Sequence, residues 1–248
     1  MSTTDHLETK GKIIVFEGLD CSFKETASNY LYENLLKLGN KVVKFEFPNY
    51  SSESAFFVNQ LLQGKYSNSD IGYTAKTTMF ILDIFHTFET EIKKYYEEGY
   101  IIILDRYYIS NMFYQTANLF NIDTGHIDNI TGLSALIDGI QSIVMNFKLV
   151  KPDLVIFMDQ DIEDIKYLLS LKKNKDINEL NLDYLKKVYH SYNFFVNNLT
   201  SNLNCKTGII KCKNHENEFK SRNDIAYNAM EIVAKNIEDS NLITNINI

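Results

Sequence analysis

The chain has 248 residues, of which 45% are hydrophobic, so it can bury one sizeable core and we expect one α/β domain. Its formal net charge is −7 and its basic residues are scattered, which argues against a polynucleotide partner. Three cysteines without a CxxC pair, and a polar Met1–Lys10 segment without an apolar run, indicate a reducing, cytoplasmic compartment. No stretch approaches the roughly 18 to 20 apolar residues that cross a bilayer, so we expect no membrane-spanning segment.

The spacing of apolar residues predicts strands that alternate with helices. Lys12–Glu17 is a short β-branched and aromatic run that ends at Gly18, which is typical of a buried parallel strand. From Thr26 the apolar residues follow helical spacing up to Gly39, which suits a helix C-cap. Further strands are predicted at 42–47, 100–104, 154–158 and 208–211, and further helices at 76–98, 182–199 and 224–237. This alternation predicts an α/β fold with a doubly wound parallel sheet.

These elements extend over residues 12–237, which we expect to form a single domain. Residues 1–11 and the Asn-rich residues 238–248 lack periodicity, and we expect a flexible N-terminus and a flexible C-terminal tail. Residues 171–180 are polar and carry lysines, which predicts a mobile lid.

A candidate phosphate-binding loop joins the first predicted strand to the first predicted helix. Residues 18–26 read GLDCSFKET, and the full motif GxxxxGK[ST] uses glycines to wrap backbone N–H groups around phosphates and lysine to reach their oxygens. Gly18 and Lys24 match this motif, whereas Phe23 replaces the second glycine and Glu25 replaces the hydroxyl residue. These residues alone suit a phosphate site or an ordinary turn with a solvated lysine equally well.

Several further motifs lie at the predicted carboxyl ends of strands. They are FEGLD at 16–20, FP at 47–48, DRY at 105–107 and PDLVIFMD at 152–159. In this order and spacing the motifs resemble those of the thymidylate kinase family, over about residues 12–192. The resemblance implies a P-loop NTPase-like three-layer sandwich, with a five-stranded parallel sheet flanked by helices. It also implies phosphoryl transfer from ATP, with Mg²⁺, to dTMP or a close pyrimidine deoxynucleotide such as dUMP, by a homodimer whose partners are small-molecule nucleotides.

The resemblance assigns roles to the residues around the transferred phosphate. Lys24 would hold the donor, Arg106 the acceptor phosphate, and Asp20 and Asp105 would organise metal and water. Asp105 and Glu25 would be the metal ligands. The other residues expected to bind ATP come from the loop and from the lid, and they are Gly18, Cys21, Ser22, Phe23, Glu25, Thr26, Lys172, Lys173 and Lys175.

The acceptor nucleotide would bind beside this loop. Phe80 would stack on the base, because aromatic rings supply contact area. Asn111, Tyr114 and Gln115 would line the base and the sugar, since amides and hydroxyls read polar edges. The Phe-Pro turn would lie beside the acceptor and includes Phe47, Pro48 and Tyr50.

The sequence departs from the family pattern where positive charge is expected. Ile84 stands where the family usually has an arginine four residues after the stacking aromatic, and the Phe-Pro turn and the lid contain no arginine. An arginine in such a site is worth a factor of about 10³ to 10⁵ in rate. A catalytically impaired nucleotide-binding relative is therefore an alternative. A deoxynucleoside kinase is another, and it would need Glu46 as the base beside a sugar hydroxyl.

Overall fold

The computed structural model describes residues 10–66, 71–198 and 205–237. Most of the predicted flexible N-terminus (1–11) and the whole predicted C-terminal tail (238–248) lie outside these residues. Within the described residues, five parallel strands form one sheet in the order β2-β3-β1-β4-β5. The strands are β1 (Lys12–Glu17), β2 (Val42–Glu46), β3 (Ile101–Asp105), β4 (Leu154–Asp159) and β5 (Lys206–Lys211). The predicted five-stranded parallel sheet is confirmed.

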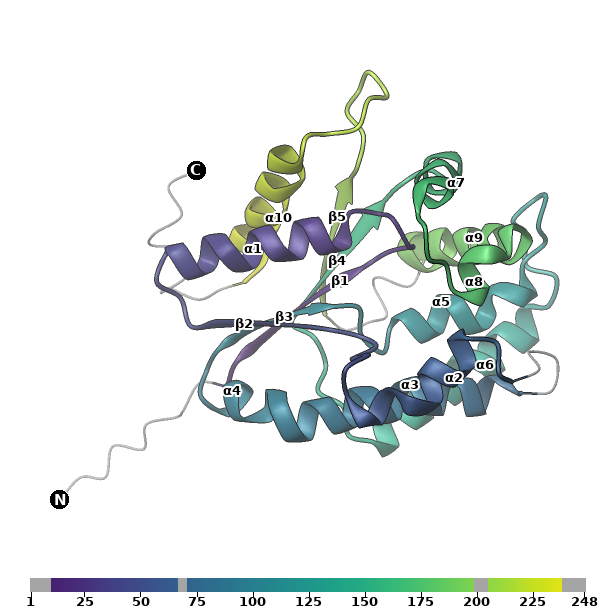
Figure 1. Cartoon of the computed structure of the whole chain (residues 1–248), viewed down its shortest axis with the longest axis horizontal. Coiled ribbons are helices and arrows are strands. Elements are labelled where there is room, and N and C mark those ends of the chain that lie inside the picture. Colours follow the sequence, from purple (N-terminus) through teal and green to yellow (C-terminus); the bar gives the residue numbers. More distant parts are fainter. Residues whose placement is uncertain (1–9, 67–70, 199–204, 238–248) are drawn as a thin grey trace.

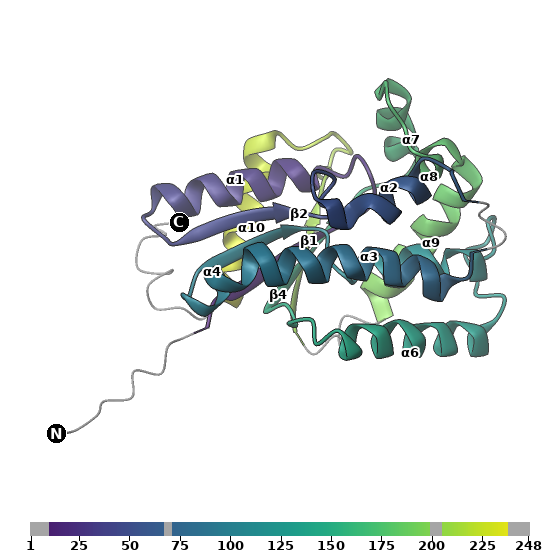
Figure 2. The same cartoon turned by 60° about the horizontal axis from the view of Figure 1, so that its bottom comes forward.

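Helices cover both faces of this sheet (Figure 1). One face carries α1 (Lys24–Lys37) and α10 (Arg222–Asn236), and the other carries α3 (Tyr73–Thr87), α5 (Ser110–Thr116), α6 (Ile130–Asn146) and α9 (Leu182–Asn198). Figure 2 shows α3 and α6 lying side by side under the sheet. The remaining α-helices of the described residues are α2 (Phe56–Leu62), α4 (Lys93–Glu97), α7 (Ile162–Leu171) and α8 (Ile177–Leu180), and short 3₁₀ helices lie at Glu53–Ala55 and Ala117–Leu119.

The central strands read as continuous apolar runs because both of their faces are buried. Along β1, Ile13 and Val15 pack into the core under α3, α5, α6 and α9, whereas Ile14 and Phe16 pack into the core under α1 and α10. All four side chains are fully buried. This burial fixes the strand register, so the polar residues at the carboxyl ends of the strands are held at one edge of the sheet.

Several element boundaries differ from the sequence prediction for structural reasons. The first helix begins at Lys24 rather than Thr26, because Phe23 takes the N-cap position. The predicted helix 76–98 consists of α3 and α4 joined by a π-helical turn, Phe88–Ile92. Asp105 belongs to β3, since it pairs with Glu46 of β2. The helices α2, α5, α6, α7 and α8 had no counterpart in the prediction.

Candidate active site

The loop between β1 and α1 has the geometry of a tight phosphate-binding turn. A Cβ atom on Gly18 would lie 2.6 Å from the Ser22 Oγ and 3.0 Å from the Met158 Cβ, so only glycine fits there. Cys21 and Phe23 both have left-handed backbone angles, with φ of 61° and 63°. The loop therefore keeps the curled backbone that the motif requires, although position 23 lacks the usual glycine.

Lys24 is buried at the start of α1 and points back along the loop. Its Nζ donates a hydrogen bond to the Leu19 carbonyl at 2.6 Å, and the Ser22 Oγ donates to the same carbonyl at 2.7 Å. Burial and the charge of Arg106 lower the pKa of Lys24 to about 8, although Asp105 and Asp20 oppose this shift. The ammonium is thus held against the loop among carboxylates.

The two altered loop positions face different surroundings. The Phe23 ring packs edge-on against Phe219, with ring centroids 5.8 Å apart. Lys213 lies over the Phe219 ring at 5.4 Å and forms an ion pair with Asp164 at 2.7 Å. Glu25 is exposed in the first turn of α1 and Thr26 is half-buried. The aromatic side chain at position 23 therefore fastens the loop to the segment before α10.

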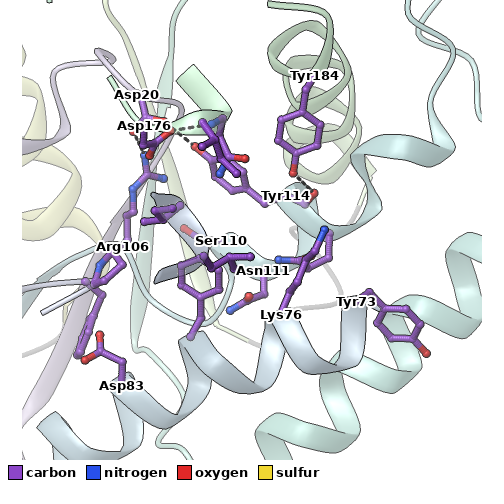
Figure 3. Close-up of a pocket in the computed structure, with 18 of the residues that line it drawn as sticks. Asp20, Tyr73, Lys76, Asp83, Arg106, Ser110, Asn111, Tyr114, Asp176 and Tyr184 are labelled. Carbon is purple, nitrogen blue, oxygen red and sulfur yellow. Dashed lines mark hydrogen bonds and ion pairs between the residues drawn. The ribbon is translucent and has the colours of Figure 1, made fainter. Parts of the chain in front are cut away.

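Arg106 connects this loop to the segment after β3. Its backbone is left-handed, with φ of 68°, and its backbone N–H donates to the Phe16 carbonyl at 2.9 Å. One guanidinium nitrogen donates to the Gly18 carbonyl at 2.8 Å, and another donates to the Asp20 carboxylate (Figure 3). A planar guanidinium makes both contacts at once, so Arg106 has a fixed direction.

Asp20 receives contacts from two sides. Besides Arg106, the Tyr114 hydroxyl donates to its carboxylate at 3.1 Å, and the Tyr114 ring lies 5.5 Å from the Arg106 guanidinium carbon. Burial raises the pKa of Asp20, but the charges of Arg106 and Lys24 outweigh burial and hold the pKa at about 2. Asp20 is therefore a fixed negative charge between the loop and the segment after β3.

Glu17, at the end of β1, accepts hydrogen bonds from the segment that follows Arg106, and the sequence analysis gave it no role. The side chain is fully buried, and its carboxylate accepts hydrogen bonds from the Tyr107 N–H at 3.0 Å, the Ser110 N–H at 3.1 Å and the Ser110 Oγ at 2.6 Å. These contacts tie the end of β1 to Tyr107, which directly follows Arg106, and to Ser110 at the start of α5. A carboxylate at the end of an otherwise apolar strand was the available signal.

A cavity of about 550 Å³ opens beside Arg106 and Asp20 (Figure 3). Each residue that the resemblance assigned to the acceptor lines it, namely Phe47, Pro48, Tyr50, Phe80, Asn111, Tyr114 and Gln115. The cavity also has lining residues that the sequence analysis gave no binding role, and they include Tyr73, Lys76, Asp83, Ser110, Asn118, Asp176, Asp183, Tyr184 and Lys187. Its volume is in the range of small-molecule sites.

The Phe-Pro turn is anchored to α3. The Phe47–Pro48 peptide bond is cis, and the Asn49 N–H donates to the Asp83 carboxylate at 2.9 Å. The Ser54 Oγ donates to the other oxygen of the same carboxylate at 2.7 Å. Through these two contacts the buried Asp83 holds the turn at the rim of the cavity. The next residue, Ile84, forms part of the cavity wall.

The lysines of the predicted lid lie outside the cavity lining. The Lys172 Nζ contacts the buried Glu179 carboxylate at 2.6 Å, Lys173 is exposed and Lys175 is half-buried. The same segment supplies Asp176, whose side chain caps α8 and which lines the cavity. The segment 171–180 thus forms part of the cavity wall, and its motion as a lid stays a prediction.

The predicted metal ligands are not part of a larger cluster. Asp105 is buried at the end of β3, and Glu25 is exposed. Among residues 10–66, 71–198 and 205–237, no three His, Cys, Asp or Glu side chains are grouped so that they could hold a metal ion. In the same ranges, no helix combines the length and apolar character needed to cross a membrane.

Ligands of parallel sheets bind beyond the carboxyl ends of the strands, and two features with buried cations lie next to each other at this edge. The first is the loop with Lys24, and the second is the cavity with Arg106 at its border. Because Arg106 and Asp20 lie between the two, the arrangement suits transfer of a phosphoryl group from one phosphate to another. Fold and site together define a P-loop nucleotide kinase.

Comparison with known proteins specifies this class further. A family model described as thymidylate kinase matches residues 16–219, so the chain belongs to the thymidylate kinase family. The thymidylate kinase of Caldicellulosiruptor saccharolyticus is 29% identical over 185 residues, which cover 74% of this chain and 82% of the relative. A protein of Invertebrate iridescent virus 6 is 32% identical over 111 residues, which cover 45% of this chain and 50% of the viral protein. The structure of thymidylate kinase from Candida albicans matches with a TM-score of 0.68 at 24% identity, and the match covers 93% of this chain and 96% of that chain.

Proposed function

We propose that this chain transfers the terminal phosphoryl group of ATP to dTMP, or to a close pyrimidine deoxynucleoside monophosphate such as dUMP. The observation that carries the proposal is the position of Arg106. Its guanidinium contacts Gly18 of the phosphate loop and Asp20 at the border of the cavity, so one cation serves both the donor and the acceptor side. Membership of the thymidylate kinase family supports the same reaction.

On the donor side, the chain supplies positive charge and backbone N–H groups. Lys24 neutralises phosphate oxygens, and the N-terminal end of α1 directs its free N–H groups toward them. Phosphoryl transfer needs no covalent enzyme intermediate, because positioning and charge neutralisation supply most of the catalysis. The loop and Lys24 are rigidly held, which suits that task.

On the acceptor side, the cavity provides surfaces for a base, a sugar and a phosphate. Phe80 stacks on the base, and Asn111 and Gln115 present amides to its edges or to the sugar. Arg106 orients the acceptor phosphate with the guanidinium N–H groups that do not contact Gly18 or Asp20. Residues 171–180 form part of the wall of this cavity and close over the donor. The charge of Lys172 interacts with Asp20 and Cys21 of the loop.

The residues present also fit a Mg²⁺ ion that arrives with ATP. Mg²⁺ in such sites uses one or two carboxylates together with phosphate oxygens and water, so a full protein cage is not required. Asp105 at the end of β3 and Glu25 in the first turn of α1 would be the carboxylates that hold it. When bound, the ion offsets the negative charge of the β- and γ-phosphates.

The alternatives lack an equivalent observation. A deoxynucleoside kinase needs a carboxylate beside the sugar hydroxyl, but Glu46 is exposed at the end of β2 and is not among the residues that line the cavity. A catalytically impaired relative rests on Phe23, Glu25, Ile84 and the arginine-free lid, and of these Phe23 keeps the loop in its curled form.

The test is to incubate the purified chain with ATP and Mg²⁺ and with dTMP, dUMP, dCMP or thymidine in turn, and to follow ADP and the phosphorylated product. We expect dTDP formation that Lys24→Met abolishes, with the thermal unfolding of that variant measured to show that it folds. Product from thymidine alone would assign the chain to nucleoside phosphorylation. ATP binding without product from any acceptor would overturn the proposal.

We also propose that the protein is a homodimer and is cytoplasmic. Leu82 and Phe85 of α3 and Met145 of α6 are apolar and exposed on adjacent helices, which is typical of a surface that another chain covers. All three cysteines are free, as in a reducing compartment. Light scattering coupled to gel filtration measures the mass of the protein in solution. A monomer at micromolar concentration would contradict the homodimer.

A further inference from the structure

The connection between β5 and α10, residues 212–220, is a short hairpin. The Lys220 N–H donates to the Cys212 carbonyl at 2.9 Å, and Lys213 and Phe219 form an antiparallel bridge. In Figure 1 the hairpin extends beyond the end of β5, on the side where α7 lies. Its shape is therefore set by its own backbone hydrogen bonds.

One side of this hairpin contacts the donor loop, which is the loop between β1 and α1. The Cys212 Sγ donates to the Ser22 carbonyl at 3.6 Å, and the Cys212 side chain is fully buried. Burial and the charge of Asp159 raise the pKa of this thiol to about 12, so the thiol keeps its proton and remains a donor. The Phe219 ring packs against Phe23 of the loop. The hairpin is therefore fixed to the donor loop at two points.

The other side of the hairpin contacts the first turn of α7. The Lys213 Nζ lies 2.7 Å from the Asp164 Oδ2, and the two side chains are only 21% and 16% exposed. The Lys213 Nζ also lies 5.4 Å from the centre of the Phe219 ring, whose face attracts a cation. A second ion pair of α7, between Lys166 and Glu163, has the same length, but the Glu163 side chain is 77% exposed and both residues belong to the helix. Of these two ion pairs, only the first joins α7 to another element.

The helix α7 carries the segment 171–180, which begins at the last residue of the helix and contributes Asp176 to the cavity lining. On its inner side α7 is held by the buried Ile165 and Leu169, and apolar contacts of this kind have no preferred direction. They therefore allow the helix to shift along the core. The ion pair of Asp164 with the hairpin opposes such a shift, because the attraction falls as the charges move apart.

We propose that Lys213 is a positioning residue for phosphoryl transfer, which fixes α7 and the segment 171–180 relative to the donor loop through its ion pair with Asp164. This inference rests on the proposed function, since it concerns how that segment closes over the donor. In this role Lys213 does not touch the nucleotide. Its removal leaves the donor loop with Lys24 in place but gives the segment several positions, of which only some suit the reaction.

The kinetic test compares Lys213→Met, Asp164→Asn and the double variant with the wild-type chain. We expect each single substitution to lower kcat with dTMP by about tenfold, because a small misplacement in a site of this kind is costly. The double variant should be no slower than the single variants, since both substitutions remove the same contact. Lys213→Arg should keep most of the rate, because it retains the charge. The matched control is Lys166→Met, which breaks the exposed ion pair of the same helix and should change kcat by less than about twofold.

Calorimetry of ATP without an acceptor separates positioning from direct contact. If Lys213 acts through Asp164, the Kd of ATP stays within about twofold of the wild-type value in both single variants. A Kd that rises about tenfold in Lys213→Met but not in Asp164→Asn would overturn the inference, because Lys213 would then bind the nucleotide itself. Effects on kcat that multiply in the double variant would also overturn it, since the two residues would then act independently.

Hydrogen exchange of the nucleotide-free chain tests the inference even where no product forms. The backbone amides of residues 162–180 should exchange about tenfold faster in Lys213→Met and in Asp164→Asn than in the wild type and in Lys166→Met. The amides of α1 are the internal reference, and equally faster exchange there would overturn the inference in favour of a general stabilising role. Unchanged exchange of residues 162–180 would overturn it as well and leave the proposed function intact. Faster exchange in a chain whose wild type forms no product would support the positioning by Lys213 and overturn the proposed function alone.

Discussion

Replacing Glu17 by glutamine should remove most of the pH dependence of folding stability between about pH 5 and pH 7. Burial raises the pKa of Glu17 from 4.5 to about 7, and this effect outweighs the hydrogen bond from Ser110 and the charge of Arg106. Between pH 4.5 and about pH 7, Glu17 keeps its proton in the folded chain but has released it in the unfolded chain. The free energy of unfolding therefore falls as the pH rises through this window. This pKa shift lowers the free energy of unfolding by roughly 3 kcal/mol over the whole window.

Glutamine keeps the shape of the site but carries no ionisable group. Its amide oxygen accepts from the N–H groups of Tyr107 and Ser110, and its amide nitrogen donates to the Ser110 hydroxyl oxygen. Urea unfolding at pH 5, 6, 7 and 8 gives the free energy of each variant. We expect the stability of Glu17→Gln relative to the wild type to increase by roughly 2 to 3 kcal/mol from pH 5 to pH 8.

The control for this series is Glu33→Gln, which changes an exposed glutamate on α1. Its stability should follow the wild type in parallel at every pH, because the side chain of Glu33 is exposed to solvent whereas that of Glu17 is fully buried. Parallel curves for Glu17→Gln and the wild type, within about 0.5 kcal/mol, would refute the assignment of a buried, proton-holding carboxyl group to Glu17.

Two further substitutions test the loop and its arginine. Arg106→Lys should lower kcat/KM for the acceptor by about 100-fold, because an ammonium cannot contact Gly18 and Asp20 at once as the planar guanidinium does. A decrease of less than about threefold would contradict this role. Phe23→Gly should change the melting temperature by less than about 3 °C, since relief of the left-handed strain offsets loss of the Phe219 contact. The same variant should bind ATP more tightly in calorimetry, because glycine lets backbone N–H groups approach the phosphates, and weaker binding would contradict this reasoning.

The strands were predictable because each is a short apolar run that the sheet buries on both faces. Ile13 to Phe16 alternate between two cores, so every position in the run must be apolar. The helix boundaries were harder to predict, since they depend on single residues. Lys24 starts α1 because Phe23 adopts a left-handed conformation, which no pattern of apolar residues predicts for phenylalanine.

The candidate site was predictable where its residues follow directly after strands. Asp20 and Arg106 come after β1 and β3, which are neighbours in the sheet, and they meet at its edge as expected. Asp83 and Lys76 lie on the same helix as Phe80, but they belong to no motif that carries the resemblance, so they were not identified. The contact between Asn49 and Asp83 joins residues 34 positions apart, and only the packing of α3 against the Phe-Pro turn creates it.

The arrangement around Arg106 bears on how a site with few arginines functions. An arginine that enters with a lid must be ordered during each reaction cycle, whereas Arg106 is already fixed by Gly18 and Asp20. Asp20 is in turn held by the Tyr114 hydroxyl, so this hydroxyl contributes to the order of the cation. Charge that is oriented before the reaction costs no reorganisation when the transition state forms.

Tyr114→Phe tests this preorganisation, because it deletes one hydroxyl and keeps the ring beside the guanidinium. The loss of a hydrogen bond to a charged carboxylate should lower kcat by about tenfold. KM for the acceptor should change less, since the ring still lines the cavity. In an Asp20→Asn background the same substitution should have a smaller effect, because its partner charge is gone. Equal effects of Tyr114→Phe in both backgrounds would show that the hydroxyl acts on the nucleotide rather than through Asp20.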